Sequence, residues 1–273
     1  MHAPKRPIAF VLASTNHGSM IVNRNDYRIV DSRIAYGVGY QLLGTSTYEG
    51  DEIAFSLGLL RCRRQHGGNG VIAIDAGANI GVHTVEWARH MAGWGEVYAF
   101  EAQEAVFYAL AGNIALNNCL NAHARLAALS SRDGELLIPK PDYFRPASFG
   151  SLELRERENT EFIGQEISYD AASCCSVPAL ALDSLRLPRV DLIKVDVEGM
   201  ELEVLAGATQ LIESHRPILV VEVLKAEKGA IEAFAANLGY CVFSMGMNAP
   251  CIHAQDKSLA HVTQNGTTLS LAA

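Results

Sequence analysis

The chain has 273 residues, of which 49% are hydrophobic and 19% charged, and its formal net charge at pH 7 is −8. These values indicate a globular protein with a substantial core, either one large domain or one domain with appendages. The negative charge argues against a general nucleic-acid-binding surface, which is basic, and no apolar run approaches the roughly 18 residues of a membrane span. The six cysteines form no Cys-x-x-Cys pair and no zinc spacing with histidine, so we expect a reducing, cytoplasmic location.

The first fifty residues carry short strand signals, and we expect residues 1–50 to be an extension of the main domain, residues 51–273. The apolar run 8–13 is too short for a secretory leader and suggests a first strand or a loose arm. Residues 20–22 and 27–30 flank a polar segment, which predicts a hairpin. A helix is expected over about 51–65, and the glycine-rich stretch after it ends the helix.

Strands and helices alternate from residue 71 onward. Strands are expected at 71–75, 97–101, 124–129, 135–138, 191–196, 218–223 and 240–245, with a last edge strand at 269–271. Helices are expected at 82–91, 104–117, 200–213 and 226–238. This alternation predicts an α/β fold with a doubly wound, mostly parallel sheet covered by helices on both faces. Residues 139–176 lack periodicity, and an insertion of that length is usually functional or mobile.

A glycine-rich turn after the strand 71–75 is the most informative segment. The strand ends at Asp75, the turn contains Gly77, Asn79 and Gly81, and a helix follows. Such a turn brings backbone N–H groups against a ligand, although its glycines can also serve packing alone. Glu101 ends the next strand, where an acid can accept both hydroxyls of a ribose. Together these residues predict a nucleoside site.

The turn also limits the kind of nucleoside. The dinucleotide fingerprint has glycine where this chain has Asn79, and Asp75 would repel a pyrophosphate. An acid and a polar turn suit a ligand with an ammonium group, a sulfonium centre and no phosphate, which are properties of S-adenosylmethionine. Two other classes stay open: a nicotinamide-dependent oxidoreductase, which Asn79 disfavours, and a non-catalytic module that binds S-adenosylmethionine.

Further acids lie at or just past strand ends, where ligands of such sheets bind. Asp196 is the first catalytic candidate, and Lys194 inside the same apolar strand requires a carboxylate nearby. Glu222 ends the next strand, and with Asp196 it could bind a divalent cation, or one acid could raise the pKa of the other and take a proton from a hydroxyl. Glu198 is as plausible a helix-capping acid as a catalyst. No metal ligand is assigned.

Three more positions are weaker candidates. His83 is either a base or a first-turn residue with a local hydrogen bond. Glu49 belongs to the run 48–51, which either folds over the ligand or is an ordinary turn. The stretch 148–151 either shapes an acceptor pocket or is a flexible loop.

These segments resemble the FkbM-type S-adenosylmethionine-dependent methyltransferases over about residues 48–245. The resemblance is carried by 71–84, 97–101, 113–117, 148–151 and 190–208. It implies a Rossmann-like, seven-stranded class I fold and O-methylation of a hydroxyl on a sugar or other small natural-product acceptor. It further implies cofactor contacts: the turn (Asp75, Gly77, Asn79, Gly81) cradles the methionine part, Glu101 holds the ribose, and Ser130 and its neighbours border the adenine. One departure is Ala102-Gln103 after Glu101, where the family usually has proline. The sequence leaves the acceptor and the oligomeric state open.

Overall fold

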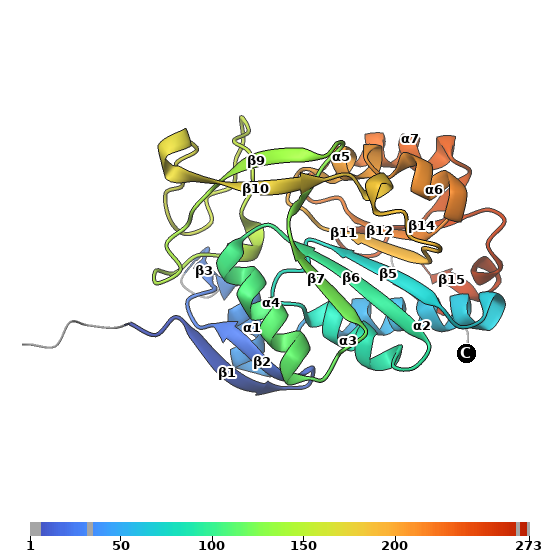
Figure 1. The fold of residues 1–273 in the computed structure, drawn as a ribbon, viewed down its shortest axis with the longest axis horizontal. Helices are drawn as coiled ribbons and strands as arrows, with labels where there is room; N and C mark the ends of the chain where they lie inside the picture. The colour runs from blue at the N-terminus through green and yellow to red at the C-terminus, as the bar shows by residue number, and fades with distance from the viewer. Residues whose placement is uncertain (1–6, 32–34, 266–267, 272–273) are drawn as a thin grey trace, which may run out of the picture.

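The computed structural model describes residues 7–31, 35–265 and 268–271. Its central element is a seven-stranded sheet of order β13-β14-β12-β11-β5-β6-β7, shown in Figure 1. β14 runs antiparallel to both of its neighbours, and the other pairs in this sheet are parallel. The strands are β5 (Val71–Ala76), β6 (Gly95–Glu101), β7 (Ala122–Leu126), β11 (Leu192–Val195), β12 (Ile218–Glu222), β13 (Tyr240–Val242) and β14 (Asn248–His253). The predicted α/β class with a mostly parallel seven-stranded sheet is confirmed.

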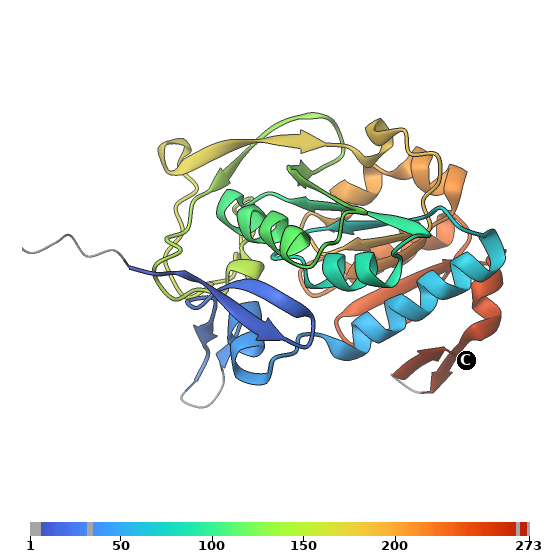
Figure 2. The same ribbon diagram turned by 60° about the horizontal axis from the view of Figure 1, so that its bottom comes forward.

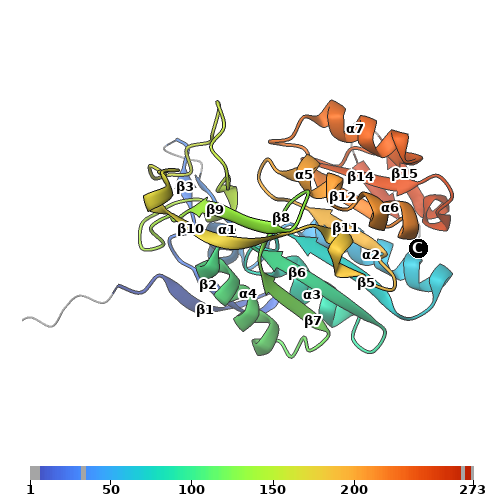
Figure 3. The same ribbon diagram turned by 45° about the horizontal axis from the view of Figure 1, so that its top comes forward.

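Helices cover both faces of this sheet, as Figures 1 and 3 show. One face carries α2 (Gly50–Gly67), α3 (Val82–His90) and α4 (Glu104–Leu116), and the other α5 (Glu201–Ala206), α6 (Thr209–His215) and α7 (Lys228–Asn237). Alternate residues of a strand point to opposite faces. Each face of the sheet has its own hydrophobic core cluster, the first against α2, α3 and α4 and the second against α5, α6 and α7. Val71 and Ala73 of β5 pack in the first cluster, and Ile74 and Ala76 pack in the second. A sheet buried on both faces explains the continuous apolar runs in the sequence.

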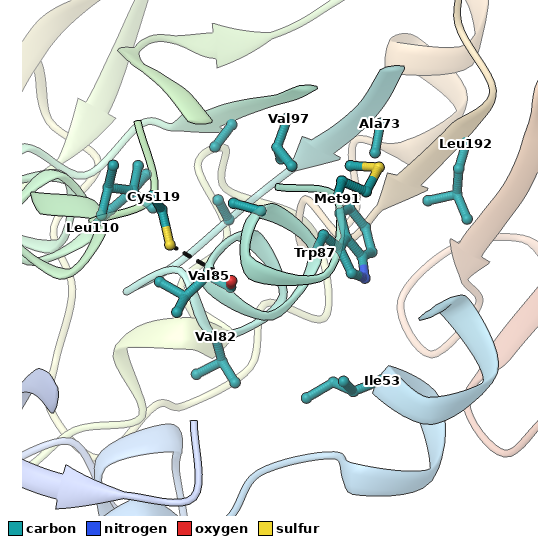
Figure 4. Close-up of a cluster of buried hydrophobic side chains, with 14 of the residues drawn as sticks. Ile53, Ala73, Val82, Val85, Trp87, Met91, Val97, Leu110, Cys119 and Leu192 are labelled. Atoms are coloured by element: carbon teal, nitrogen blue, oxygen red, sulfur yellow. Dashed lines mark hydrogen bonds between the residues drawn. The ribbon is translucent and has the colours of Figure 1, made fainter. Parts of the chain in front are cut away.

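The first cluster is centred on α3, which Figure 4 shows between the sheet and α2. Trp87 is 1% exposed, and its indole N–H donates to Ser56 of α2 at 2.8 Å. Met91, just after α3, packs toward Ala73 of the sheet in the same view. A large apolar ring with a satisfied donor fixes the position of α3, and with it the turn that precedes the helix.

The N-terminal region consists of β1 (Phe10–Thr15), β2 (Gly18–Asn23), β3 (Arg28–Ile29), β4 (Ala35–Tyr36) and α1 (Val38–Thr45). β1 confirms the strand alternative for the run 8–13. The predicted hairpin between 20–22 and 27–30 is wrong, because β2 pairs with β1 and β3 pairs with β4. Instead of forming a turn between paired strands, the polar segment bonds to more distant residues. Its Asp26 is buried and accepts the N–H groups of Gly39 and Phe149. Apolar residues of this region join the first core cluster, and the boundary at residue 50 stays a prediction.

A second, three-stranded sheet has the order β8-β10-β9, from β8 (Ala128–Leu129), β9 (Gly134–Pro139) and β10 (Cys174–Leu180). It lies over α5 and the end of β7, as Figure 3 shows. The predicted strand 124–129 is therefore two strands in two sheets. The segment from β9 to β10, the predicted insertion, contains η1 (Phe149–Ser151) and η2 (Ala171–Ser173), and η3 (Leu182–Leu185) follows β10.

Three other expectations are corrected near the C-terminus. The predicted helix 200–213 is split into α5 and α6 at Gly207, which packs so tightly that a Cβ there would lie 2.1 Å from the carbonyl oxygen of Ser130. The predicted strand 240–245 ends at residue 242, and the sequence did not predict β14. The predicted edge strand 269–271 lies in a hairpin of β15 (Val262–Asn265) and β16 (Thr268–Leu271), which follows η4 (Lys257–His261) and rests beside α2 in Figure 2. Among the described helices, none combines the length and apolar character needed to cross a membrane.

Candidate active site

A cavity of roughly 530 Å³ opens at the carboxyl ends of β5, β6, β11 and β12. This volume falls within the range of about 300–1,000 Å³ that is typical of small-molecule sites. The chain passes from β5 to β6 on one side, whereas β11 lies on the other side of β5, so the cavity sits where the strand order reverses. Residues of the N-terminal region, of the insertion and of the loop after β12 complete its walls.

Most of the predicted site residues line this one cavity. On the cofactor side these are Glu49, Asp75, Gly77, Asn79 and Glu101, and on the catalytic side His83, Asp196, Glu198 and Glu222. Two predicted cofactor residues lie outside the lining: Gly81 begins α3 behind the turn, and the hydroxyl of Ser130 donates to Glu203 at 3.3 Å. The neighbouring residues 127–129 line the cavity in place of Ser130.

The turn after β5 is pressed against the end of β11. Gly77 has a φ of +83°, and a Cβ at this position would lie 1.8 Å from the carbonyl oxygen of Asp196. Only glycine fits this close approach in this conformation. Asp75 is 1% exposed and accepts the hydroxyl of Thr84 at 2.6 Å, which fixes its carboxylate beside the first turn of α3. The turn therefore brings an oriented acid and the β11 end to one wall of the cavity.

Glu101 ties this turn to the end of β6. Its two carboxylate oxygens accept the backbone N–H groups of Asn79 at 3.0 Å and Gln103 at 2.8 Å. Burial raises the pKa of Glu101 to about 7, although these hydrogen bonds act in the opposite direction. The side-chain amide of Gln103 donates to the carbonyl of Phe149 at 2.9 Å. Gln103, in the pair Ala102-Gln103 that follows Glu101, thus joins the end of β6 to the insertion.

Three acids of the cavity lining, Asp196, Glu198 and Glu222, form a cluster at the ends of β11 and β12, here called the acidic trio. Lys194 donates to Asp196 Oδ2 at 2.7 Å, which confirms the carboxylate expected beside this buried lysine. Burial would lower the pKa of Lys194, but the surrounding carboxylates, Asp196 first among them, raise it well above its usual value. Lys225 Nζ lies 2.6 Å from Glu198 Oε2. Each of these two acids thus uses one oxygen to hold a lysine.

The pKa values of the trio reflect crowding of like charges. Burial and then repulsion from Asp196 raise the pKa of Glu222 far above the ordinary value of a glutamate. The same two causes raise the pKa of Glu198, against the attraction of Lys225. The helix-capping alternative for Glu198 is wrong, because Glu201 accepts the N–H groups of Val197 and Gly199 before α5. Glu198 instead adopts a left-handed conformation with φ of +56° and faces the cavity.

His83 belongs to a second group of titratable side chains, with Glu49 and Glu52. Its Nε2 lies 3.4 Å from Glu52 Oε1 and 3.9 Å from Glu49 Oε2. Neither ring-to-acid contact has hydrogen-bond geometry, and this nitrogen has no other hydrogen-bond partner among the described residues. The local hydrogen bond expected as the alternative for His83 is therefore not present on Nε2.

Sequence reasoning missed Lys225, Glu161 and Glu52. Lys225 Nζ lies 3.0 Å from Glu161 Oε2 and donates to the carbonyl of Ser151 at 2.7 Å, so it links the end of β12 to the insertion. The sequence does show Lys225 three residues after Glu222, the acid that ends β12. Its partners Glu161 and Ser151, however, lie in the insertion, which has no periodicity. Glu52 is in the first turn of α2, where an acid is ordinarily explained by the helix dipole.

Residues 75–242 match the Methyltransferase FkbM domain. The chain is 33% identical to Methyltransferase sdnD of Sordaria araneosa over 190 residues, which cover 57% of this chain and 72% of sdnD. The structure of Methyltransferase FkbM from Methylobacillus flagellatus KT is similar with 14% identity and a TM-score of 0.46, over 68% of this chain and 43% of that one. The O-methyltransferase TomG from Streptomyces achromogenes is similar with 12% identity and a TM-score of 0.43, over 76% and 82% of the two chains. Because both TM-scores are below 0.5, the assignment depends on the domain match and on sdnD. The chain therefore belongs to the FkbM family and is an S-adenosylmethionine-dependent methyltransferase.

Proposed function

We propose that this chain binds S-adenosylmethionine between the ends of β5 and β6 and methylates a hydroxyl of a sugar or other small natural-product acceptor. The observation that carries the proposal is the charge of the cavity wall. Lys194 and Lys225 are the lysines of the lining, which contains no arginine among the described residues, and both are held by carboxylates. Among the described lining residues, no lysine or arginine is therefore left for a pyrophosphate, whereas acids remain for a ligand with an ammonium and a sulfonium group. This balance disfavours the nicotinamide alternative.

The residues around the turn fit this ligand chemically. Glu101, at the end of β6, would accept the ribose hydroxyls, and Asp75 with the N–H groups of the turn would face the methionine part. Gly77 lets the turn pass directly against the carbonyl of Asp196, which brings the turn and the end of β11 to the same part of the cavity. The residues at 127–129, with backbone and apolar side chains, would border the adenine in place of Ser130.

When bound, S-adenosylmethionine supplies a methyl group on positively charged sulfur, which passes to the acceptor oxygen as its bond to sulfur breaks. The protein mainly aligns the acceptor, excludes water and provides a route for the hydroxyl proton. Asp196 is the first candidate to receive that proton, since Lys194 fixes its carboxylate at the cavity wall. Glu222, Glu198 and His83 remain further candidates, and a non-catalytic binding role is the alternative that transfer assays exclude.

The acceptor side of the cavity is formed by mixed polar and apolar residues. Tyr36 and Gln41 of the N-terminal region face Leu224 and Met247 near the ends of β12 and β14. Such a surface suits an acceptor with hydroxyl groups and apolar ring faces, as in a glycoside. The cytoplasmic location expected from the cysteines stays a prediction.

The proposal is tested first by isothermal calorimetry with S-adenosylhomocysteine and with NADH. Heat on titration of the first ligand and none with the second is expected. Methyl transfer from labelled S-adenosylmethionine to a panel of glycosides and macrocyclic alcohols then tests the reaction. Asp196→Asn is expected to lower turnover at saturating acceptor by about 10²-fold or more. No heat with S-adenosylhomocysteine would refute the cofactor site, and full turnover in Asp196→Asn would refute the role of this acid.

A further inference from the structure

One oxygen of the acidic trio has no partner. Glu222 is 9% exposed, and its Oε2 is fully buried without a hydrogen bond from any described residue. A buried carboxylate oxygen without a donor or a cation is unfavourable. Glu222 lines the same cavity as Asp196 and Glu198, and one of its carboxylate oxygens belongs to the cluster with theirs. A cation at this cluster would satisfy the unpartnered oxygen.

The other two acids leave oxygens free at the same point. Lys194 occupies Oδ2 of Asp196, and Lys225 occupies Oε2 of Glu198. One ligand oxygen from each member of the trio lies within 4.8 Å of the others. Oxygens on opposite sides of Mg²⁺ are about 4.2 Å apart, and those on opposite sides of Ca²⁺ roughly 4.6–5.2 Å. The spacing therefore suits three oxygens around a single cation.

We propose that Asp196, Glu198 and Glu222 bind one divalent cation, such as Mg²⁺ or Mn²⁺, at the ends of β11 and β12. Carboxylate oxygens are the ligands that these cations prefer. A cation beside the trio would offset the mutual repulsion of its carboxylates and give the unpartnered oxygen of Glu222 a partner. Lys194 and Lys225 each hold one oxygen of Asp196 and Glu198, as partners of ligating carboxylates commonly do.

Three protein ligands leave coordination positions that open into the cavity. A cation there would hold a hydroxyl oxygen of the acceptor and position it for transfer. This role, unlike cation binding itself, rests on the proposed function. It favours an acceptor with two neighbouring oxygens, such as a vicinal diol, because both could bind the same ion.

The second acidic group, Glu49 with Glu52 and His83, provides a matched control. Its ligand atoms also lie within 4.8 Å of one another. His83 already stands 3.4 Å from Glu52, however, and forms an ion pair with it when protonated. A glutamate-to-glutamine change at Glu52 therefore alters charge beside the cavity residues Glu49 and His83 without removing a trio ligand.

The experiment is titration of the purified full chain with Mn²⁺, with free Mn²⁺ measured by electron paramagnetic resonance. We expect one bound Mn²⁺ per chain with a Kd below about 1 mM, displaced by excess Mg²⁺. Glu222→Gln should weaken binding at least about tenfold, and Asp196→Asn similarly, because each removes a charged ligand. Glu52→Gln should stay within about twofold of the unaltered chain. Circular dichroism verifies that each variant is folded.

Absence of Mn²⁺ binding near 1 mM overturns the inference. An unchanged affinity in both trio variants, or an equal loss in Glu52→Gln, overturns it too. Calorimetry with S-adenosylhomocysteine on the same samples separates the two proposals. Binding of that ligand without Mn²⁺ binding refutes only the cation site, and Mn²⁺ binding without methyl transfer refutes only the proposed function.

Discussion

The Glu101 carboxylate lies where the turn after β5, the end of β6 and the cavity meet. Two backbone N–H groups already hold it in the structure without a ligand, so its orientation does not depend on the ribose. A second lone pair on each oxygen is available to accept a ligand hydroxyl. Its pKa of about 7 means that a proton competes with this acceptor role near neutral pH.

The affinity for S-adenosylhomocysteine is expected to depend on this proton. Ribose hydroxyls donate to the ionised carboxylate, so binding favours ionised Glu101 and releases a proton where the free protein holds one. Affinity should therefore rise with pH through the pKa of about 7 and become level above it. If only the ionised form binds, the Kd should be about tenfold lower at pH 8 than at pH 6. Calorimetry at both values measures the change.

The control for this prediction is Glu101→Gln, which cannot titrate. Its affinity should be at least about tenfold weaker at pH 8 and nearly independent of pH. An affinity that falls as pH rises, or the same pH dependence in the variant, would assign the effect to another group.

At the scale of elements, the turn after β5 depends on glycine for two separable reasons. Gly77 and Gly70 both have positive φ, +83° and +87°, but only at Gly77 would a Cβ meet other atoms within 4 Å. Gly70→Ala should lower the free energy of unfolding by about 1 kcal/mol through backbone strain alone. Gly77→Ala should lower it by at least about 2 kcal/mol more and remove cofactor binding, because the turn must move away from Asp196. Urea denaturation compares them, and equal losses would contradict the packing explanation.

Lys225 is expected to hold the insertion against the end of β12. The Lys225 side chain is only 9% exposed. Its removal leaves Glu198 without the cation that pairs with it and takes from Glu161 one of two cations, since Arg28 remains. Lys225→Met should lower the free energy of unfolding by about 3 kcal/mol, as for other broken buried ion pairs. It should also speed proteolytic cleavage within residues 140–173. Lys228→Met is the matched control, since its ion pair with Glu232 is exposed and contributes little. Equal cleavage of both variants would argue against the link.

The elements predicted correctly from the sequence are those whose hydrophobic pattern lies within one short stretch of the chain. β5, β6, β11 and β12 are apolar runs ended by acids, and carboxyl ends of parallel strands meet at one edge, which brought Asp75, Glu101, Asp196 and Glu222 together. β14 was missed because it contains Pro250 and short apolar segments. The N-terminal hairpin was mispredicted because the polar residues around Asp26 bond to groups distant in sequence.

The difference between local patterns and long-range contacts also explains why the sequence did not predict some of the site residues. The partners of Gln103 and Lys225 are carbonyls and acids of the insertion, and nothing in the composition of that segment indicates where it folds. The family resemblance implied that Ser130 and its neighbours border the adenine. Because β7 ends at Leu126 and the chain enters the second sheet at β8, residues 127–129 line the cavity and Ser130 does not. Contacts between segments far apart in sequence decide these positions.

At the scale of the whole molecule, the N-terminal region is packed as part of the main core. Met20 and Val22 of β2 are completely buried, in one cluster with Leu110 of α4. The side chain of Asn113 on α4 accepts the N–H of Ile21 and donates to the carbonyl of Ile80 in the turn before α3. Through Asn113, β2 is thus bonded to α4, and α4 to the turn before α3. We therefore expect the extension and the main domain to unfold together.

Met20→Ala tests this expectation. It should lower the free energy of unfolding by about 2–4 kcal/mol, because it leaves a cavity in the shared core. Both tryptophans, Trp87 and Trp94, pack in that cluster on the main-domain side and report on it by fluorescence. Fluorescence and circular dichroism should shift together to lower urea in Met20→Ala. Leu12→Ala, on the same hairpin but 66% exposed, should change stability by less than about 0.5 kcal/mol. If the tryptophan transition stayed in place while circular dichroism showed a separate early loss, residues 1–50 would be an independent unit, and the cavity would keep its β5 and β6 walls without them.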